Sequence, residues 1–201
     1  MKKKELEIML QKIEVPEKIK AELEQYITPA SIAADILWLA YYNGDIENRI
    51  VIDLGCGTGI FSIGAALLKA KKVIGVDIDE RLVKIATKEA KKLGAIVDFL
   101  VMDVEDFNLQ GDTVIMNPPF GAQYANRGAD KKFVKKAMEI SNVFYSLHLK
   151  DSVEFIKKLV EKNGWKIEGQ KLYRFPIKAS LPFHEKRVAH YDVVMINARK
   201  I

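Results

Sequence analysis

The chain has 201 residues, of which 49% are hydrophobic, and its formal net charge is +5. This length and composition predict a single domain over residues 1–201 with a sizeable core, and the mild positive charge favours a polyanionic partner. One cysteine excludes a disulfide framework, and no run of about 18 apolar residues is present to span a membrane. Because Glu5-Leu6-Glu7 follows the basic start of the chain, we expect no signal peptide and a cytoplasmic protein.

The first 44 residues predict a helical cap that precedes the main fold. The pattern favours helices at 2–13, 16–26 and 29–43, the first two being separated at Val15-Pro16. Thr28 is the predicted N-cap of the third helix, and Asn43-Gly44 is its predicted stop.

From residue 45 onward, short β-branched runs alternate with helical stretches, which predicts an α/β, Rossmann-like core at 45–201. Such alternation is typical of βαβ units and of a mostly parallel sheet with helices on both faces. The last two runs are joined without a helix, so they predict an antiparallel pair at the end of the sheet. The predicted strands are 50–54, 73–77, 96–102, 113–116, 143–147, 165–174 and 188–198, with a helix at 151–163.

A glycine-rich loop, DLGCGTG at 53–59, follows the first predicted strand and opens a helix. Glycines let backbone N–H groups approach a ligand closely, and the start of a helix favours negative charge. Asp77 ends the next strand, where an acid can bind the two ribose hydroxyls of a nucleoside. The loop and the acid together predict a nucleoside-containing cofactor.

The spacing of this loop indicates which cofactor. A dinucleotide loop has the pattern G-x-G-x-x-G, which Ile60 breaks, so the sequence disfavours a nicotinamide dehydrogenase. G-x-G-x-G with an acid two residues ahead resembles motif I of the class I S-adenosylmethionine-dependent methyltransferases. The resemblance implies cofactor contacts from Asp53, Gly55, Gly57, Thr58 and Gly59, ribose binding by Asp77 beside Ile78, and adenine contacts from Asp103 and Val104. Asp103 could also, or instead, cap a helix.

A second motif, Asn117-Pro118-Pro119-Phe120, follows the fourth predicted strand and should face the same crevice. The side-chain oxygen of Asn117 and the carbonyl of Pro118 can accept both N–H bonds of an exocyclic amino group and orient its nitrogen toward a methyl donor. Phe120 offers a face on which an unpaired base can stack. A purely structural turn is the alternative, since Asn-Pro often starts one.

This second motif resembles motif IV of the amino-group methyltransferases, which modify adenine N6, cytosine N4, guanine N2 or a glutamine amide. The resemblance implies direct transfer, with Asn117, Pro118, Pro119 and Phe120 as the catalytic set and Asn117 also near the cofactor. Upstream, residues 24–29 resemble motif X, which closes over the cofactor. That likeness implies cofactor contacts from Gln25, Tyr26 and Thr28, so that Thr28 is both a helix cap and a cofactor contact. The alternative is that Thr28 caps the helix and does not contact the cofactor.

Over nearly its whole length the chain resembles the methyltransferase-like family that modifies an adenine at N6 in small-subunit ribosomal RNA. The likeness is carried by the segments 45–48, 61–64, 77–80, 114–121, 128–130, 145–148 and 183–186, and residues 122–127 depart from it. It implies a class I methyltransferase fold with seven strands and an antiparallel last strand, S-adenosylmethionine as cofactor, and structured rRNA as substrate. In eukaryotic members it also implies a small zinc-binding activator subunit; otherwise we expect a monomer.

Basic residues near both ends of the predicted crevice are candidate RNA contacts, because phosphate contacts supply sequence-independent affinity. A solvated lysine-rich surface is the alternative. Histidines are few and scattered, so we expect no metal site. The candidates are Arg127, Lys131, Lys132, Lys178, His184, Lys186 and Arg187.

Three other functions stay open at this point. The same motifs would serve a protein glutamine methyltransferase or a guanine-N2 methyltransferase. The chain could also be a non-catalytic RNA-binding subunit that keeps the methyltransferase fold, although intact motifs at 53–59 and 117–120 argue against such decay.

Overall fold

The computed structural model describes residues 1–16, 20, 25–120, 128–178 and 188–201. Within them lies a seven-stranded sheet of order β3-β2-β1-β4-β5-β7-β6. The first five strands are parallel, and β7 is antiparallel to both of its neighbours, β5 and β6. This confirms the predicted fold class. The strands are β1 (Ile50–Leu54), β2 (Lys72–Asp77), β3 (Asp98–Val101), β4 (Thr113–Met116), β5 (Val143–Leu149), β6 (Trp165–Lys178) and β7 (Val188–Lys200).

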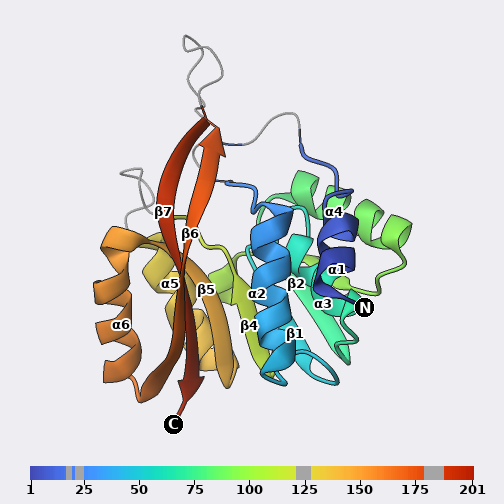
Figure 1. Cartoon of the computed structure of the whole chain (residues 1–201). Coiled ribbons are helices and arrows are strands. Elements are labelled where there is room, and N and C mark those ends of the chain that lie inside the picture. The colour runs from blue at the N-terminus through green and yellow to red at the C-terminus, as the bar shows by residue number, and fades with distance from the viewer. Residues whose placement is uncertain (17–19, 21–24, 121–127, 179–187) are drawn as a thin grey trace.

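Five strands differ from the sequence-based bounds: β2, β5 and β7 are one or two residues longer than predicted, and β3 and β6 differ more. β3 covers only Asp98–Val101, the residues that pair with β2, and Ile96 lies outside it and is 89% exposed. β6 continues to Lys178, because β7 pairs with it along almost its whole length. The long β6–β7 hairpin extends beyond the body of the sheet (Figure 1).

Helices cover both faces of the sheet (Figure 1). One hydrophobic core joins the sheet to the first four helices, and a second core joins it to the last two. The first group is α1 (Lys3–Leu10), α2 (Ala30–Tyr42), α3 (Ile60–Leu67) and α4 (Glu80–Leu93); the second is α5 (Ala129–Ile140) and α6 (Val153–Lys162), with short 3-10 turns at Val104–Asp106 and Lys150–Ser152.

The N-terminal region differs from its prediction in two respects. Of the predicted helix 16–26, the described residues 16, 20, 25 and 26 are irregular, and the rest of that range lies outside the described residues. The prediction that Thr28 caps the third helix is wrong. Pro29 is the N-cap of α2 and no side chain caps it, because the Thr28 hydroxyl is engaged by Asn117 instead. The predicted stop is confirmed, since α2 ends at Tyr42 with Asn43 as its C-cap.

The register of the parallel strands brings two distant motifs together. Leu54 at the end of β1 pairs with Val76 of β2 on one side and with Met116 of β4 on the other. The segments that follow these three strands therefore leave the same edge of the sheet side by side, where an open α/β sheet binds its ligands.

Candidate active site

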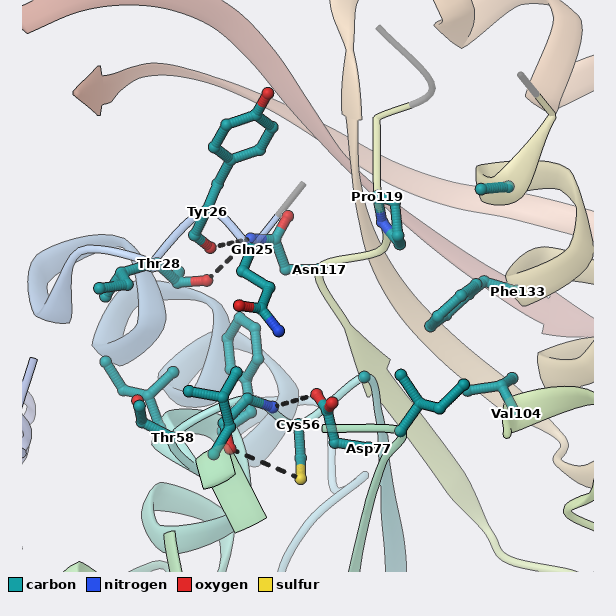
Figure 2. Close-up of a pocket in the computed structure, with 18 of the residues that line it drawn as sticks. Gln25, Tyr26, Thr28, Cys56, Thr58, Asp77, Val104, Asn117, Pro119 and Phe133 are labelled. Carbon is teal, nitrogen blue, oxygen red and sulfur yellow. Dashed lines mark hydrogen bonds between the residues drawn. The ribbon is translucent and has the colours of Figure 1, made fainter. Parts of the chain in front are cut away.

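A cavity of about 270 Å³ opens at the carboxyl ends of β1, β2 and β4 (Figure 2). It is formed by the glycine loop, the acid after β2, the segment after β3, the segment after β4, the N-terminal segment at 25–28 and the start of α5. The lining residues are Pro16, Gln25, Tyr26, Ile27, Thr28, Gly55, Cys56, Gly57, Thr58, Ile60, Phe61, Asp77, Ile78, Leu82, Asp103, Val104, Glu105, Asn117, Pro119, Ala129, Lys132 and Phe133.

The glycine loop needs two of its glycines for different reasons. At Gly55 a Cβ atom would lie 2.9 Å from the ring of Phe133, so only glycine allows α5 to approach this closely. At Gly57 nothing lies within 4 Å of an added Cβ, but the φ angle of +53° favours glycine. The open space beside Gly57 lets a ligand rest against the loop.

Asp77 faces the cavity and is held by the backbone. Its Oδ2 accepts a hydrogen bond from the Gly57 N–H at 2.8 Å, and its Oδ1 accepts one from the Asp79 N–H at 2.8 Å. The side chain forms no ion pair with any cation in the described chain. Burial raises the pKa of Asp77 above its usual range, partly offset by these N–H donors.

Asp53 lies beneath the loop rather than in the cavity wall. Its Oδ2 accepts from the Ser62 N–H at 2.9 Å and from the Ser62 hydroxyl at 2.6 Å, which ties β1 to α3. Burial raises the pKa of Asp53 from 3.8 to about 7. Neither Asp53 nor Gly59, the N-cap of α3, lines the cavity, so their part in ligand binding is to shape the loop.

The residues predicted to contact the adenine, Asp103 and Val104, line the cavity, and Ile78 lines it too. Asp103 accepts a hydrogen bond from the Glu105 N–H at 2.9 Å and so caps the 3-10 turn Val104–Asp106. The structure thus shows the capping role of Asp103 and also places the residue in the cavity wall.

Asn117 is the polar residue of the second motif that lines the cavity. Its Nδ2 donates to the carbonyl oxygen of Tyr26 at 3.2 Å and to Oγ1 of Thr28 at 3.0 Å. Its Oδ1 is buried and has no hydrogen-bond partner among the residues that the structure describes. Figure 2 shows the amide oxygen directed away from both acceptors of the nitrogen. An unpartnered buried acceptor is costly, so it marks a position where a donor is expected to bind.

The rest of the second motif lies around this amide. Pro119 lines the cavity and Pro118 is buried behind it. The ring of Phe120 is only 5% exposed: it stacks on Tyr26 at a centroid distance of 5.5 Å and meets Phe175 edge-on at 5.9 Å. The face predicted to receive a base is therefore covered by Tyr26 in this structure.

Two features of the site have no local signature in the sequence. Phe133 forms a wall opposite Gln25 and Thr28 in the view of Figure 2. Gln25 donates from Nε2 to Oδ2 of Asp79 at 3.0 Å, which fastens the N-terminal segment to the start of α4. Hydrogen bonds from Arg81 hold the pKa of Asp79 well below its usual range. Only the packing of segments far apart in the chain brings these groups together.

Of the candidate RNA contacts, Lys132 lines the cavity and pairs with Glu105 at 2.8 Å. Lys131 lies over the ring of Phe155, 5.9 Å from its centroid. Arg127, His184, Lys186 and Arg187 lie outside the described residues, as does the side chain of Lys178.

Two further properties concern only the part of the chain that the structure describes. No helix there is both long and apolar enough to cross a membrane. No group of three or more His, Cys, Asp or Glu side chains gathers there in a way that could hold a metal ion.

Known proteins resemble this chain over its whole length. A family model described as a methyltransferase domain matches residues 46–176. Protein MJ0284 of Methanocaldococcus jannaschii is 41% identical over 100% of this chain and 95% of its own. The rRNA N(6)-adenosine-methyltransferase METTL5 of Danio rerio is 37% identical over 98% of each chain. The crystal structure of PH1948 from Pyrococcus horikoshii, a candidate RNA methyltransferase, covers 100% of this chain and 98% of its own with a TM-score of 0.92 and 39% identity. The chain therefore belongs to the class I methyltransferase family.

Proposed function

We propose that this protein is an S-adenosylmethionine-dependent methyltransferase that modifies adenine N6 in ribosomal RNA. The observation that carries the proposal is the buried, unpartnered Oδ1 of Asn117 at a cavity beside the glycine loop. The full-length similarity to an rRNA N(6)-adenosine-methyltransferase supports the RNA substrate over the glutamine and guanine alternatives.

The cavity suits the cofactor in both shape and chemistry. Asp77 presents a carboxylate to the ribose hydroxyls, and Gly57 leaves open space beside it. Apolar side chains of Ile78, Val104 and Phe133 surround the place where the adenine would lie. When bound, S-adenosylmethionine supplies an electrophilic methyl group on a sulfonium.

The acceptor amino group is a poor nucleophile, since its lone pair is delocalised into the ring. The Oδ1 of Asn117 and the carbonyl of Pro118 accept its two N–H bonds and favour a more tetrahedral nitrogen aimed at the methyl group. Transfer is then a direct in-line displacement without a covalent enzyme intermediate. The methylated nitrogen is acidic enough to release its proton to water, so no dedicated general base is required.

The target base stacks on Phe120 in this proposal, which requires the ring of Tyr26 to leave the face that it now covers. Lys132 at the rim, together with Lys131 and the basic residues at 127, 178, 184, 186 and 187, contacts RNA phosphates.

A small zinc-binding activator subunit is part of the proposal, with a monomer as the form of the chain without it. The edge of the sheet at β3 supports a protein partner, because β3 has β2 as its one neighbour among the described strands and apolar side chains are exposed there: Val101 in β3 is 51% exposed, and Ile96, just before the strand, is 89% exposed. Edge strands and exposed apolar surface are favoured docking sites.

The test is methyl transfer from labelled S-adenosylmethionine to unmodified small-subunit rRNA, followed by nucleoside digestion and mass spectrometry. We expect N6-methyladenosine as the sole product. N2-methylguanosine, or label found only in protein, would replace the proposed acceptor with one of the alternatives. A chain that fails to bind the cofactor at all would support the non-catalytic reading.

A further inference from the structure

The orientation of the Asn117 amide is dictated by its neighbours. A backbone carbonyl can only accept a hydrogen bond, so the atom facing the oxygen of Tyr26 has to be the amide nitrogen. The hydroxyl of Thr28 accepts the second N–H bond of the same nitrogen. Both donors of the amide are thereby used, and the oxygen is left as the free group.

The reversed orientation would defeat the proposed chemistry. If the amide turned over, its nitrogen would meet the N–H bonds of the target amino group, donor against donor, while its oxygen would face an acceptor at Tyr26. An enzyme of this kind therefore needs an element that disfavours the reversed state. The backbone carbonyl of Tyr26 supplies one acceptor, and Thr28 supplies the other from a side chain.

We infer that Thr28 is a positioning residue, whose hydroxyl holds the Asn117 amide so that Oδ1 is offered to the target amino group. This inference rests on the proposed function and deepens it. Thr28 is only 5% exposed, so water cannot easily take the place of its hydroxyl if that group is removed. The segment that carries Thr28 is itself held, since Gln25 bonds to Asp79 at the start of α4.

Hydrogen bonds together with short stretches of backbone therefore connect the catalytic amide to the proposed ribose carboxylate. Asn117 is bonded to Thr28 and Tyr26, the neighbouring Gln25 is bonded to Asp79, and the Asp79 N–H is bonded to Asp77. The segment 25–28 thus reaches both halves of the site, which explains how a residue before the first strand can affect the transfer step.

The test compares Thr28→Val with Thr28→Ser. Valine keeps the shape of threonine and removes the acceptor, whereas serine keeps the hydroxyl and removes the methyl group. We expect kcat of Thr28→Val to fall about tenfold, the size of one lost hydrogen bond in the transition state. We expect the Kd of Thr28→Val for S-adenosylmethionine to stay within about threefold of wild type, a smaller change than the loss of one hydrogen bond would cause. We expect Thr28→Ser to recover most of kcat.

Each other result would overturn the inference. An unchanged kcat in Thr28→Val would show that the Tyr26 carbonyl alone holds the amide. A loss of cofactor affinity with kcat preserved at saturating cofactor would make Thr28 only a cofactor contact. Serine as impaired as valine would show that the hydroxyl is not the group that matters. Failure of the proposed function is seen separately, in the wild-type arm: a wild-type chain that methylates no adenine would remove the proposed function, and this inference with it.

Discussion

An aspartate is buried at each end of the sheet, and the two carboxylates have different hydrogen-bond partners. At the amino ends of β4 and β5, Asp45 accepts from Nη2 of Arg199 at 2.9 and 3.1 Å and from the hydroxyl of Tyr145 at 2.7 Å. At the carboxyl ends, Asp77 faces the cavity and, within the described part of the chain, accepts hydrogen bonds only from backbone N–H groups.

The difference separates a structural acid from a binding one. Asp45 is 5% exposed and is neutralised by a guanidinium, so it has no need of a ligand. Asp77 is 8% exposed and is held in position by backbone N–H groups, which carry no full charge. No cation among the described residues compensates its negative charge, and burial raises its pKa. A buried acid without a cation, at the edge of a sheet where ligands bind, indicates a site.

The largest effect that we expect comes from the carboxyl end of the sheet, at Asn117. Asn117→Ala removes the acceptor of the amino group, so kcat should fall about 100- to 1,000-fold, as when one preorganised hydrogen-bonding group is removed from other active sites. Cofactor affinity should change by no more than a few-fold, measured by calorimetry. A variant that retained near-full activity on rRNA would remove Asn117 from catalysis.

The next effect tests the binding acid itself. Asp77→Asn keeps the shape of the side chain and removes its charge, so the affinity for S-adenosylmethionine should fall about 10- to 100-fold, the range for a lost hydrogen bond to a charged group. At saturating cofactor, kcat should stay close to wild type. Equal affinity in the two proteins would mean that Asp77 has only a structural role, and the contrast with Asp45 would then disappear.

Asp45, the structural acid, should contribute to stability and not to cofactor binding. Asp45→Asn breaks a largely buried ion pair with Arg199. We expect the free energy of unfolding to fall by about 1–3 kcal/mol. This is below the range for fully buried pairs, because Arg199 is 38% exposed and keeps Glu168 as a partner. Cofactor affinity should not change. The matched control is Glu168→Gln, which removes the more exposed partner of the same guanidinium and should cost less in urea unfolding. A cofactor defect in Asp45→Asn would contradict the division between the two ends.

The last prediction is a pH dependence carried by Asp53, the acid beneath the glycine loop. Its pKa rises from 3.8 to about 7 on folding, so the folded chain holds this proton more tightly than the unfolded chain does. The contribution of Asp53 to stability is therefore fully present below about pH 4 and is lost as the pH rises to about 7. Asp53→Asn can still accept a hydrogen bond from Ser62, and it should remove this pH-dependent contribution to stability. Thermal melts of both proteins across that range would show the wild type losing stability relative to the variant; parallel curves would exclude the shift.

Local spacing in the sequence was sufficient for much of the fold and for both motifs. The alternating runs predicted the parallel sheet, the unbroken connection predicted the antiparallel pairing, and the residues at 53–59, 77 and 117–120 met at one edge because strand ends meet there. These features depend on neighbours within a few residues, and their geometry follows from the handedness and register of a parallel sheet.

What the sequence could not supply depends on contacts between distant segments. The hydrogen bonds of Asn117 reach 89 and 91 residues back along the chain, and that of Gln25 reaches 54 residues forward. Thr28 was predicted as a cap for the same reason: a threonine before a helix is a good local cap, and only the fold reveals that Asn117 takes its hydroxyl. The stack of Tyr26 on Phe120 likewise has no local signature.

The place of β7 has a consequence for how the chain is made. β7 lies inside the sheet between β5 and β6, although it follows both of them in the chain. During synthesis the cofactor side is complete once the start of α5 at residues 129–133 has been made, whereas β5 has no partner on its outer side until residues 188–200 emerge. Chains are extended at about 5–20 residues per second, so a nascent molecule exposes the β5 edge for seconds. Until β7 arrives that strand is a template for wrong pairings, so chaperone dependence should increase when translation is stalled within β6.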